Sequence, residues 1–223
     1  MALSSPICCI CGNSICGKYY IDWIGHTVCA SHIDLVARCA SCGQFCNSKA
    51  KEIGLGMKVC VHCQKYRIEK EESHVIVEYI KNIYRNSPIG EVTHWHLKMV
   101  NALRLFEMTQ DKNTRGLAQA RGHDYTIFVY RELSRVAFAQ VLAHEMLHVY
   151  QYVHHLSPPK AICEGFCNLG SYVVLNAINN KEAKAAIENL MNNSDPVYGD
   201  GFRQMLELFR HGGWEEAITK IRQ

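Results

Sequence analysis

The most constraining feature of this sequence is a set of cysteine and histidine residues that occurs twice at a fixed offset. Each unit consists of two pairs of ligand residues. Two residues lie between the members of a pair, and seventeen residues lie between the pairs. The second unit begins 31 positions after the first. The members are Cys8, Cys11, Cys29 and His32 in the first unit and Cys39, Cys42, Cys60 and Cys63 in the second. Two ligands on one tight turn can hold half of a tetrahedral zinc ion, and the distant pair completes the coordination. The repeat therefore predicts two successive zinc sites.

We expect both of these zinc sites to be structural. Four protein ligands leave no open coordination position, which a catalytic zinc requires. Each unit is too small to build a hydrophobic core, so metal binding would supply most of its folding free energy. Gly12 and Gly43, which follow the first ligand pair of each unit, suit the positive φ angles of such turns.

Other ligand assignments within the repeat stay open. His26 with Cys29 forms a second possible pair that would replace Cys29 with His32, and Cys9 offers a shifted frame. The offset of 31 residues favours His32. Two further cysteines are interpreted as small buried residues that bind no metal: Cys16 and Cys46.

Composition indicates a globular protein of a reducing compartment. Ten of the twelve cysteines lie in the first 63 residues, and the N-terminus has neither the basic nor the long apolar segment of a signal peptide. No uninterrupted apolar run reaches the ~18–20 residues of a membrane span. We therefore expect a cytoplasmic location without a membrane partner, where paired cysteines bind metal more often than each other. The net charge of +3 is too small to predict a nucleic-acid partner.

The composition changes after Arg67, where we place the boundary between a zinc module (residues 1–67) and a second domain (residues 68–223). Apolar residues at helical spacing follow a short charged stretch and end before Pro88. Residues 93–100 and 124–130 are typical of strands. Helical spacing dominates the rest, with a break at Gly212 and Gly213. The expected fold class is α+β, with a short antiparallel sheet and several helices.

Residues 134–153 are typical of a helix that carries a metal-binding motif. Ser134 is a suitable N-cap, and the sequence His144-Glu145-Met146-Leu147-His148 follows it. Residues four apart lie one above the other on a helix, so both imidazoles can face one zinc ion. Glu145 is displaced around the helix and can act as general base. Apolar neighbours would bury this helix on most sides, where unpaired histidines are costly.

The third ligand of this site decides the class of peptidase. His154 lies six residues after His148, the spacing at which metzincins place a third histidine. That pattern needs a glycine at the position that Gln151 occupies, to turn the chain back toward the metal. We therefore expect the helix to continue and to carry His154 away from the metal.

Glu164 is the better candidate for the third ligand. Ser157-Pro158-Pro159 ends the first helix and begins a second, in which Glu164 has mostly apolar neighbours. The alternative is a solvated helix glutamate. Cys163 and Cys167 are interpreted as core thiols. Two histidines and a glutamate leave one position for water, as a catalytic zinc of the gluzincin type requires.

These residues predict hydrolysis of peptide bonds. Zinc would polarise the scissile carbonyl, and Glu145 would take a proton from water and pass it to the leaving amine. Three residues are candidate donors to the oxyanion, and the sequence does not rank them: His123, Tyr130 and Tyr172. Either predicted strand could present an edge to which an extended peptide adds.

The order of a LIM-like zinc module and an HExxH peptidase resembles the plant DA-one and DA-related family of ubiquitin-activated LIM peptidases. The resemblance covers nearly the whole chain and rests on these motifs: Cys29-Ala30-Ser31-His32, Arg38-Cys39-Ala40-Ser41-Cys42, Lys58-Val59-Cys60-Val61-His62-Cys63, Thr114-Arg115-Gly116-Leu117, Leu142-Ala143-His144-Glu145-Met146-Leu147-His148 and Cys163-Glu164-Gly165-Phe166-Cys167.

The resemblance implies a site composition. It implies that a catalytic zinc is bound by His144, His148 and Glu164, with Glu145 as base. It also supports Cys29 with His32 over the His26 alternative, and it assigns no physical role to Thr114-Arg115-Gly116. The plant members carry ubiquitin-interacting segments and a further LIM domain ahead of this region, so ubiquitin dependence is not carried over to this shorter relative.

We therefore expect a zinc-dependent endopeptidase acting on protein or peptide substrates, with one catalytic and two structural zinc ions. The zinc module is a candidate surface for a protein partner. The main alternative is a non-catalytic adaptor whose peptidase-like domain is a scaffold, although no element of the metal and base set is missing. A DNA-associated protease is disfavoured by the low net charge.

Overall fold

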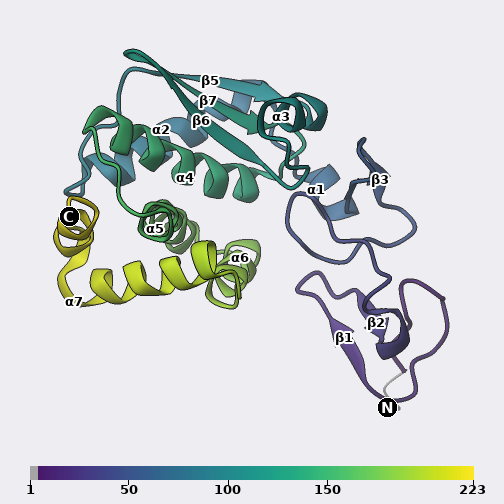
Figure 1. Ribbon diagram of the computed structural model, residues 1–223. Coiled ribbons are helices and arrows are strands. Elements are labelled where there is room, and N and C mark those ends of the chain that lie inside the picture. Colours follow the sequence, from purple (N-terminus) through teal and green to yellow (C-terminus); the bar gives the residue numbers. More distant parts are fainter. Residues whose placement is uncertain (1–4) are drawn as a thin grey trace.

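The computed structural model describes residues 5–223, which form an α+β fold with short sheets and seven α-helices (Figure 1). The strands are β1 (Tyr19–Ile21), β2 (Thr27–Cys29), β3 (Lys51–Glu52), β4 (Lys58–Val59), β5 (Trp95–Val100), β6 (Gly116–Arg121) and β7 (Asp124–Tyr130). The helices are α1 (Val61–Lys65), α2 (Ser73–Arg85), α3 (Ala102–Thr109), α4 (Arg135–Val153), α5 (Lys160–Ile178), α6 (Lys181–Met191) and α7 (Gly201–Ile221). Three shorter helical turns complete the chain: η1 (Ala30–His32), η2 (Lys70–Glu72) and η3 (Pro196–Asp200).

The two predicted zinc units share their backbone conformation as well as their ligand spacing. Gly12 donates its N–H to the carbonyl oxygen of Cys8 over 2.9 Å, and its counterpart Gly43 donates to Cys39 over 2.8 Å. The φ angles of the two glycines are +73° and +75°, a left-handed conformation that glycine adopts without steric cost. Each unit then closes with a short antiparallel hairpin, β1–β2 in the first and β3–β4 in the second.

The second unit lies between the first unit and the rest of the chain (Figure 1). Asp22 of the first unit is buried and accepts a hydrogen bond from the backbone N–H of Phe45 in the second unit over 3.1 Å. Each unit has a small apolar cluster of its own, whereas residues from Ile68 onward build one large core.

The largest sheet has three strands in the order β5-β7-β6. β6 and β7 form an antiparallel hairpin, and β7 runs parallel to β5 with Leu97 opposite Ile127. Both predicted strands are present, since β7 covers residues 124–130 and β5 begins two residues inside the range 93–100.

The expectation of an antiparallel sheet was wrong, because the sheet is mixed. The chain leaves β5 through α3 and returns as β6 at the opposite edge. The tight hairpin that follows β6 then inserts β7 between the two edge strands, which makes β7 parallel to β5.

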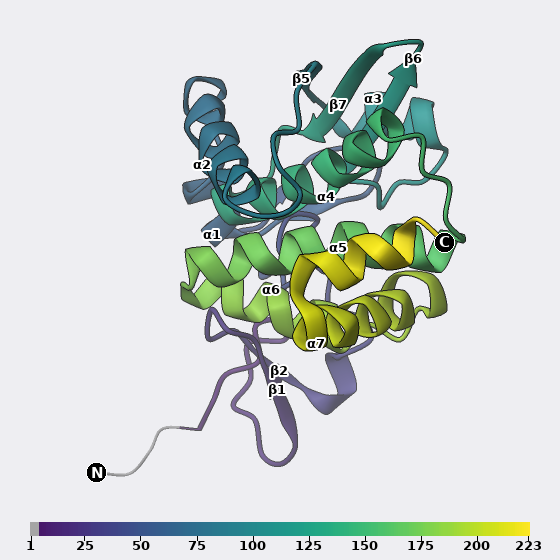
Figure 2. The ribbon, with the colours of Figure 1, turned by 90° about the vertical axis from the view of Figure 1, so that its left-hand side faces the viewer.

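The helices form layers beneath this sheet. α4 packs against β6 and β7 on one side and against α5 on the other, and α5 packs in turn against α7 (Figures 1 and 2). The predicted N-cap is confirmed, since the hydroxyl of Ser134 accepts from the N–H of Ala137 over 3.2 Å. By length and composition α5 is apolar enough to cross a membrane, a test that the core helix of a folded domain also passes.

The C-terminal helices cover the far side of α5. The predicted break is confirmed within α7, where Gly212 and Gly213 have non-helical backbone angles. Trp214 directly after the break packs edge-on against Phe166 of α5, with ring centroids 5.7 Å apart. This contact fixes α7 against the helix that carries Glu164.

Candidate functional site

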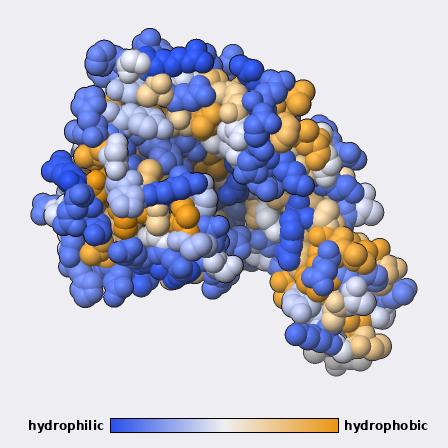
Figure 3. Space-filling model, in the orientation of Figure 1, coloured by the Kyte–Doolittle hydropathy of each residue, from blue (hydrophilic) through white to orange (hydrophobic). Residues whose placement is uncertain are grey.

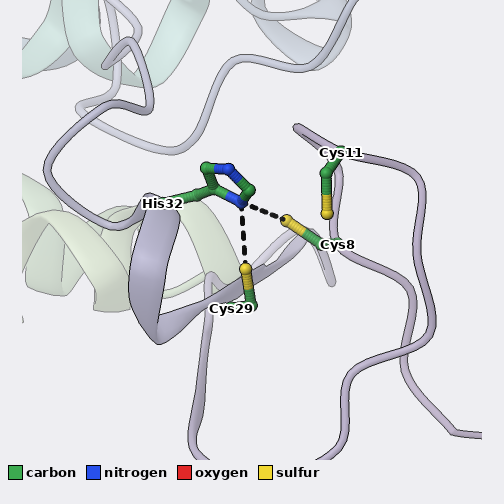
Figure 4. A group of neighbouring side chains, drawn as sticks. All are labelled: Cys8, Cys11, Cys29 and His32. Atoms are coloured by element: carbon green, nitrogen blue, oxygen red, sulfur yellow. Dashed lines mark hydrogen bonds between the residues drawn. The ribbon is translucent and has the colours of Figure 1, made fainter.

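The four ligand residues of the first zinc unit lie together, with all four ligand atoms within 4.8 Å of one another (Figure 4). Nδ1 of His32 lies 3.0 Å from Sγ of Cys29 and 3.7 Å from Sγ of Cys8. Sulfur and nitrogen ligands of one tetrahedral zinc ion are about 3.6 Å apart at bond lengths of ~2.3 and ~2.1 Å. The group therefore fits a tetrahedral metal ion.

His26 is not part of this group. Its Nδ1 lies 3.2 Å from the Asp22 carboxylate, and its Nε2 lies 3.2 Å from the side-chain amide of Asn47. Both ring nitrogens are therefore engaged, Nδ1 within the first unit and Nε2 across to the second unit. Of the alternatives that the sequence left open, the structure gathers the set with His32 and leaves Cys9 outside it.

The second unit gathers four sulfur atoms within 4.8 Å of one another: those of Cys39, Cys42, Cys60 and Cys63. The sulfurs of Cys42 and Cys60 are 3.8 Å apart, which matches the ~3.8 Å between two sulfur ligands of one tetrahedral zinc ion. Hydrogen bonds with neighbouring thiols, first of all Cys42, lower the pKa of Cys39. Cys46 is buried as expected, but Cys16 is exposed, because a unit this small has no second layer to cover it.

Helices α4 and α5 bring the HExxH histidines and Glu164 together. The Nε2 atoms of His144 and His148 are 3.1 Å apart. Oε2 of Glu164 lies 3.2 Å from Nε2 of His144 and 3.6 Å from Nε2 of His148. Nitrogen and oxygen ligands of one tetrahedral zinc ion are about 3.3 Å apart at bond lengths of ~2.0–2.1 Å. The three atoms therefore fit three positions around a single ion.

Partners on α5 orient both imidazoles. Nδ1 of His144 lies 3.0 Å from Oδ1 of Asn168, whose Nδ2 donates to the backbone carbonyl of Tyr198 over 3.0 Å. Because the amide nitrogen is used by Tyr198, Oδ1 accepts the Nδ1–H of His144 and leaves Nε2 unprotonated for a metal. Sγ of Cys163 lies 3.8 Å from Nδ1 of His148 on the same side. Asn168 was not predicted as part of the site, although it lies one helical turn after Glu164.

Charges within this group are complementary. Burial raises the pKa of the Glu164 carboxyl, but hydrogen bonds with His144 and His148 outweigh it and hold that pKa well below its usual value. Burial lowers the pKa of His148, but hydrogen bonds with Cys163 and Glu164 outweigh it and raise the pKa to about 10. The site therefore favours a positive charge between the imidazoles and the carboxylate.

Cys167 is a second residue close to the histidine pair. Its sulfur lies within 4.8 Å of a ring nitrogen of both His144 and His148, so the three also form a group that could hold a metal. The side chain is fully buried, as expected of a core thiol, and its sulfur accepts a hydrogen bond from Gln151 over 3.1 Å. Burial raises the pKa of Cys167 well above its usual value. A neutral thiol is a weaker ligand than the charged carboxylate of Glu164.

Glu145 lies on the side of α4 that faces β6. A Cβ atom added at Gly116 would lie 2.7 Å from Oε1 of Glu145 and 2.5 Å from Cγ1 of Val141, so only glycine fits there. This close approach gives the Thr114-Arg115-Gly116 motif a physical role, which the sequence alone did not show. Burial raises the pKa of Glu145 above its usual value.

His154 does not join the metal-binding group. α4 continues past Gln151 and ends at Val153, the last residue of the predicted range, and His154 is its C-cap residue. The His154 ring lies against Tyr150, with ring centroids 4.4 Å apart. The spacing of six residues after His148 therefore does not bring this imidazole to the metal, as expected.

The HExxH residues and Glu164 open onto a cleft of about 450 Å³ between β6, α4 and α5. None of the three predicted oxyanion donors lines it: His123, Tyr130 and Tyr172. Tyr130 instead faces the second cysteine-rich unit, where its buried hydroxyl has no hydrogen-bond partner among residues 5–223. Two other tyrosines line the cleft, Tyr152 of α4 and Tyr198 of η3. The sequence offered no signal for Tyr198, because η3 reaches the cleft only through tertiary packing.

The sheet edge beside the cleft is β6. Of the two strands that we expected to present an edge, β7 is central and paired on both sides, whereas β5 is an edge strand but lies at the opposite edge and does not line the cleft. Three residues of β6 line the cleft: Gly116, Leu117 and Ala118. The sequence of β6 (GLAQAR) lacks the β-branched and aromatic residues that mark a strand, and therefore gave no prediction.

No protein-family model matches this chain, and no curated protein or solved structure matches it. The geometry and chemistry of the site therefore carry the functional conclusion.

Proposed function

We propose that this chain is a zinc-dependent endopeptidase of the gluzincin type, joined to a LIM-like module that holds two structural zinc ions. The observation that carries the proposal is the convergence of His144 Nε2, His148 Nε2 and Glu164 Oε2 at the wall of a cleft, with separations of 3.1, 3.2 and 3.6 Å. Two imidazoles and one carboxylate occupy three positions of a tetrahedral zinc ion and leave the fourth open.

The residues around this centre support peptide hydrolysis. When bound, zinc would polarise the scissile carbonyl and lower the pKa of water beside it. Glu145 lies next to His144 on α4 and lines the same cleft, so its carboxylate can accept a proton from the attacking water and give it to the leaving amine. Tyr198 lines the cleft from η3, and its hydroxyl can donate to the developing oxyanion.

The cleft suits an extended peptide. It follows Gly116, Leu117 and Ala118 along β6, an edge strand whose outer side pairs with no other strand among the described residues. A substrate strand could pair there by displacing the hydroxyl of Tyr152 from the carbonyl of Ala118, where it donates over 3.3 Å. A peptide bound in this way would place its backbone across the metal centre. This arrangement favours an endopeptidase acting within unfolded or flexible protein segments.

The resemblance to the plant DA-related LIM peptidases supports the same proposal, and we propose membership of that family. Its Thr114-Arg115-Gly116 motif contacts both parts of the chain in this structure. Gly116 gives space to Glu145, and Arg115 donates to the backbone carbonyl of Ser41 over 2.9 Å. A motif with both contacts is expected where a zinc module and a peptidase domain act together.

A second candidate function is a non-catalytic adaptor. The first zinc unit exposes large apolar side chains to solvent, including Ile7 at 60% and Leu35 at 73% exposure. Apolar residues gather on the surface of this unit (Figure 3), and a contiguous exposed apolar patch favours a protein partner. A peptidase could also bind a protein partner through this surface, so the two functions are compatible. Peptidase activity is excluded only if the chain is an adaptor and nothing else.

The decisive experiment compares the wild-type protein with Glu145→Gln on unfolded protein substrates. We expect cleavage by the wild type and a loss of at least about 100-fold in the variant, because a general base contributes ~10²–10⁴-fold. Metal analysis of both proteins should give three zinc ions per chain. Equal cleavage by both, or no cleavage by a folded wild type that holds three zinc ions, would contradict the proposal.

A further inference from the structure

The second zinc unit contacts the N-terminus of the HExxH helix through Ser41. Ser41 lies within the first ligand turn of the second unit, between Cys39 and Cys42, and is fully buried. Its hydroxyl accepts a hydrogen bond from the backbone N–H of Ser134, the N-cap of α4, over 2.8 Å. The position of Ser41 depends on the ligand turn, so the metal-bound turn and the start of α4 are held together.

A carboxylate from α6 makes a second connection between the same two elements. Glu182 accepts a hydrogen bond from the hydroxyl of Ser134 through one oxygen. Its other oxygen lies 3.0 Å from Nε2 of His62, the residue before the ligand Cys63. Both oxygens of this buried carboxylate are therefore occupied, one at the helix N-cap and one at the zinc unit.

The third connection leads directly to the general base. Nη1 of Arg115 donates to the backbone carbonyl of Ser41 over 2.9 Å. The next residue, Gly116, begins β6, and its lack of a side chain leaves space for Glu145. A shift of Ser41 would therefore be transmitted to Glu145 by two routes. One runs through Arg115 and Gly116, and the other runs through Ser134 and along α4. A misplacement of about 1 Å at a catalytic group can cost ~10²-fold in rate.

Within residues 5–223, the first unit makes no equivalent hydrogen bond, although Trp23 lines a pocket together with Val136 and Glu182. The position that corresponds to Ser41 is occupied by Ile10, which is 41% exposed. Among the described residues, no hydrogen bond joins residues 5–36 to residues 68–223. The first unit instead contacts the second, through Asp22 and through Trp23, whose ring lies 4.7 Å from that of His62.

We propose that the metal ion of the second unit controls the catalytic site, whereas the ion of the first unit does not. When the second unit holds its metal ion, Ser41 stays between Ser134 and Arg115, and the base Glu145 keeps its position beside Gly116. Loss of that ion releases the N-cap of α4 and the start of β6 together. The activity part of this inference rests on the proposed peptidase function.

The internal repeat supplies a matched pair of variants. Cys42→Ser removes one ligand from the second unit, and Cys11→Ser removes the corresponding ligand from the first. We expect peptidase activity to fall at least about 10-fold in Cys42→Ser and to stay within about 2-fold of the wild type in Cys11→Ser. Amide hydrogen exchange of residues 115–118 and 134–137 should speed up in Cys42→Ser alone. The exchange measurement needs no activity, so it tests the coupling even if the chain is not a peptidase.

Ser41→Ala separates the coupling from the stability of the zinc unit. This variant keeps all four cysteine ligands and should retain its zinc, but it leaves the buried N–H of Ser134 without a partner. We expect faster exchange at residues 134–137 and reduced activity at full metal content, with the exposed Ser48→Ala as control. Equal effects of Cys42→Ser and Cys11→Ser on exchange, or unchanged exchange in both Cys42→Ser and Ser41→Ala, would overturn the proposal.

Discussion

At the scale of single residues, the burial of Glu145 determines how the proposed enzyme responds to pH. A general base acts only as the carboxylate, and burial raises its pKa above the usual value. Activity should therefore fall as the pH drops through this raised pKa, which lies above the ~4.3 of an exposed glutamate. The pH profile of kcat/KM measures it directly. An acidic limb at or below pH ~4.3 would show that the group that titrates is not a buried glutamate.

The choice of third ligand is also a matter of single residues. Glu164 and Cys167 both lie beside the two histidines, but only the carboxylate is charged at neutral pH. We expect Glu164→Ala to lose the third zinc ion and Cys167→Ser to keep it, as measured by metal content after dialysis. Loss of the ion in Cys167→Ser with retention in Glu164→Ala would reverse the assignment. His154→Ala serves as control, because His154 lies outside the group.

At the scale of elements, the site depends on how closely β6 approaches α4. Gly116→Ala would place a methyl group 2.5 Å from Val141 and 2.7 Å from the Glu145 carboxylate. We expect a loss of ~1–3 kcal/mol in the free energy of unfolding, as overpacking generally costs. Activity should also fall, because Glu145 must move. Denaturant unfolding and kcat/KM measure the two effects.

A double variant separates these two effects. Adding Val141→Ala removes the shorter contact. The double variant Gly116→Ala/Val141→Ala should therefore lose less free energy of unfolding than the sum of the losses in the two single variants. The contact with Glu145 remains, and activity should stay low. Full recovery of activity in the double variant would mean that the Glu145 contact is unimportant.

At the scale of the whole molecule, the buried carboxylate of Glu182 joins the second cysteine-rich unit to the N-terminus of α4. Glu182→Ala would leave the hydroxyl of Ser134 without its acceptor at the start of α4. Removing one partner of a buried hydrogen bond costs ~1–3 kcal/mol. The control Glu188→Ala, at an exposed position of the same helix, should change stability by less than ~0.5 kcal/mol. Equal stability of the two variants would show that the interface does not depend on this carboxylate.

Much of the local structure could be predicted, because short-range geometry encodes it. The strand at residues 124–130, the N-cap Ser134 and the break at Gly212 and Gly213 are all present. The repeated spacing also identified the members of both zinc units, since two ligands three positions apart meet wherever the turn forms. The placement of Glu164 followed from a proline-initiated helix that packs back on α4.

What only the tertiary structure decided involves residues far apart in the chain. The order of the three strands, the free edge at β6 and the arrival of Tyr198 at the cleft depend on packing that no local pattern records. The contact between Arg115 and Ser41 spans 74 residues, and that between Glu182 and His62 spans 120. By itself, the sequence determined which side chains could bind metal, because ligand chemistry and helical or turn spacing are local. The fold decided how the cysteine-rich units meet the elements that form the cleft, because that contact forms only when distant surfaces bury each other.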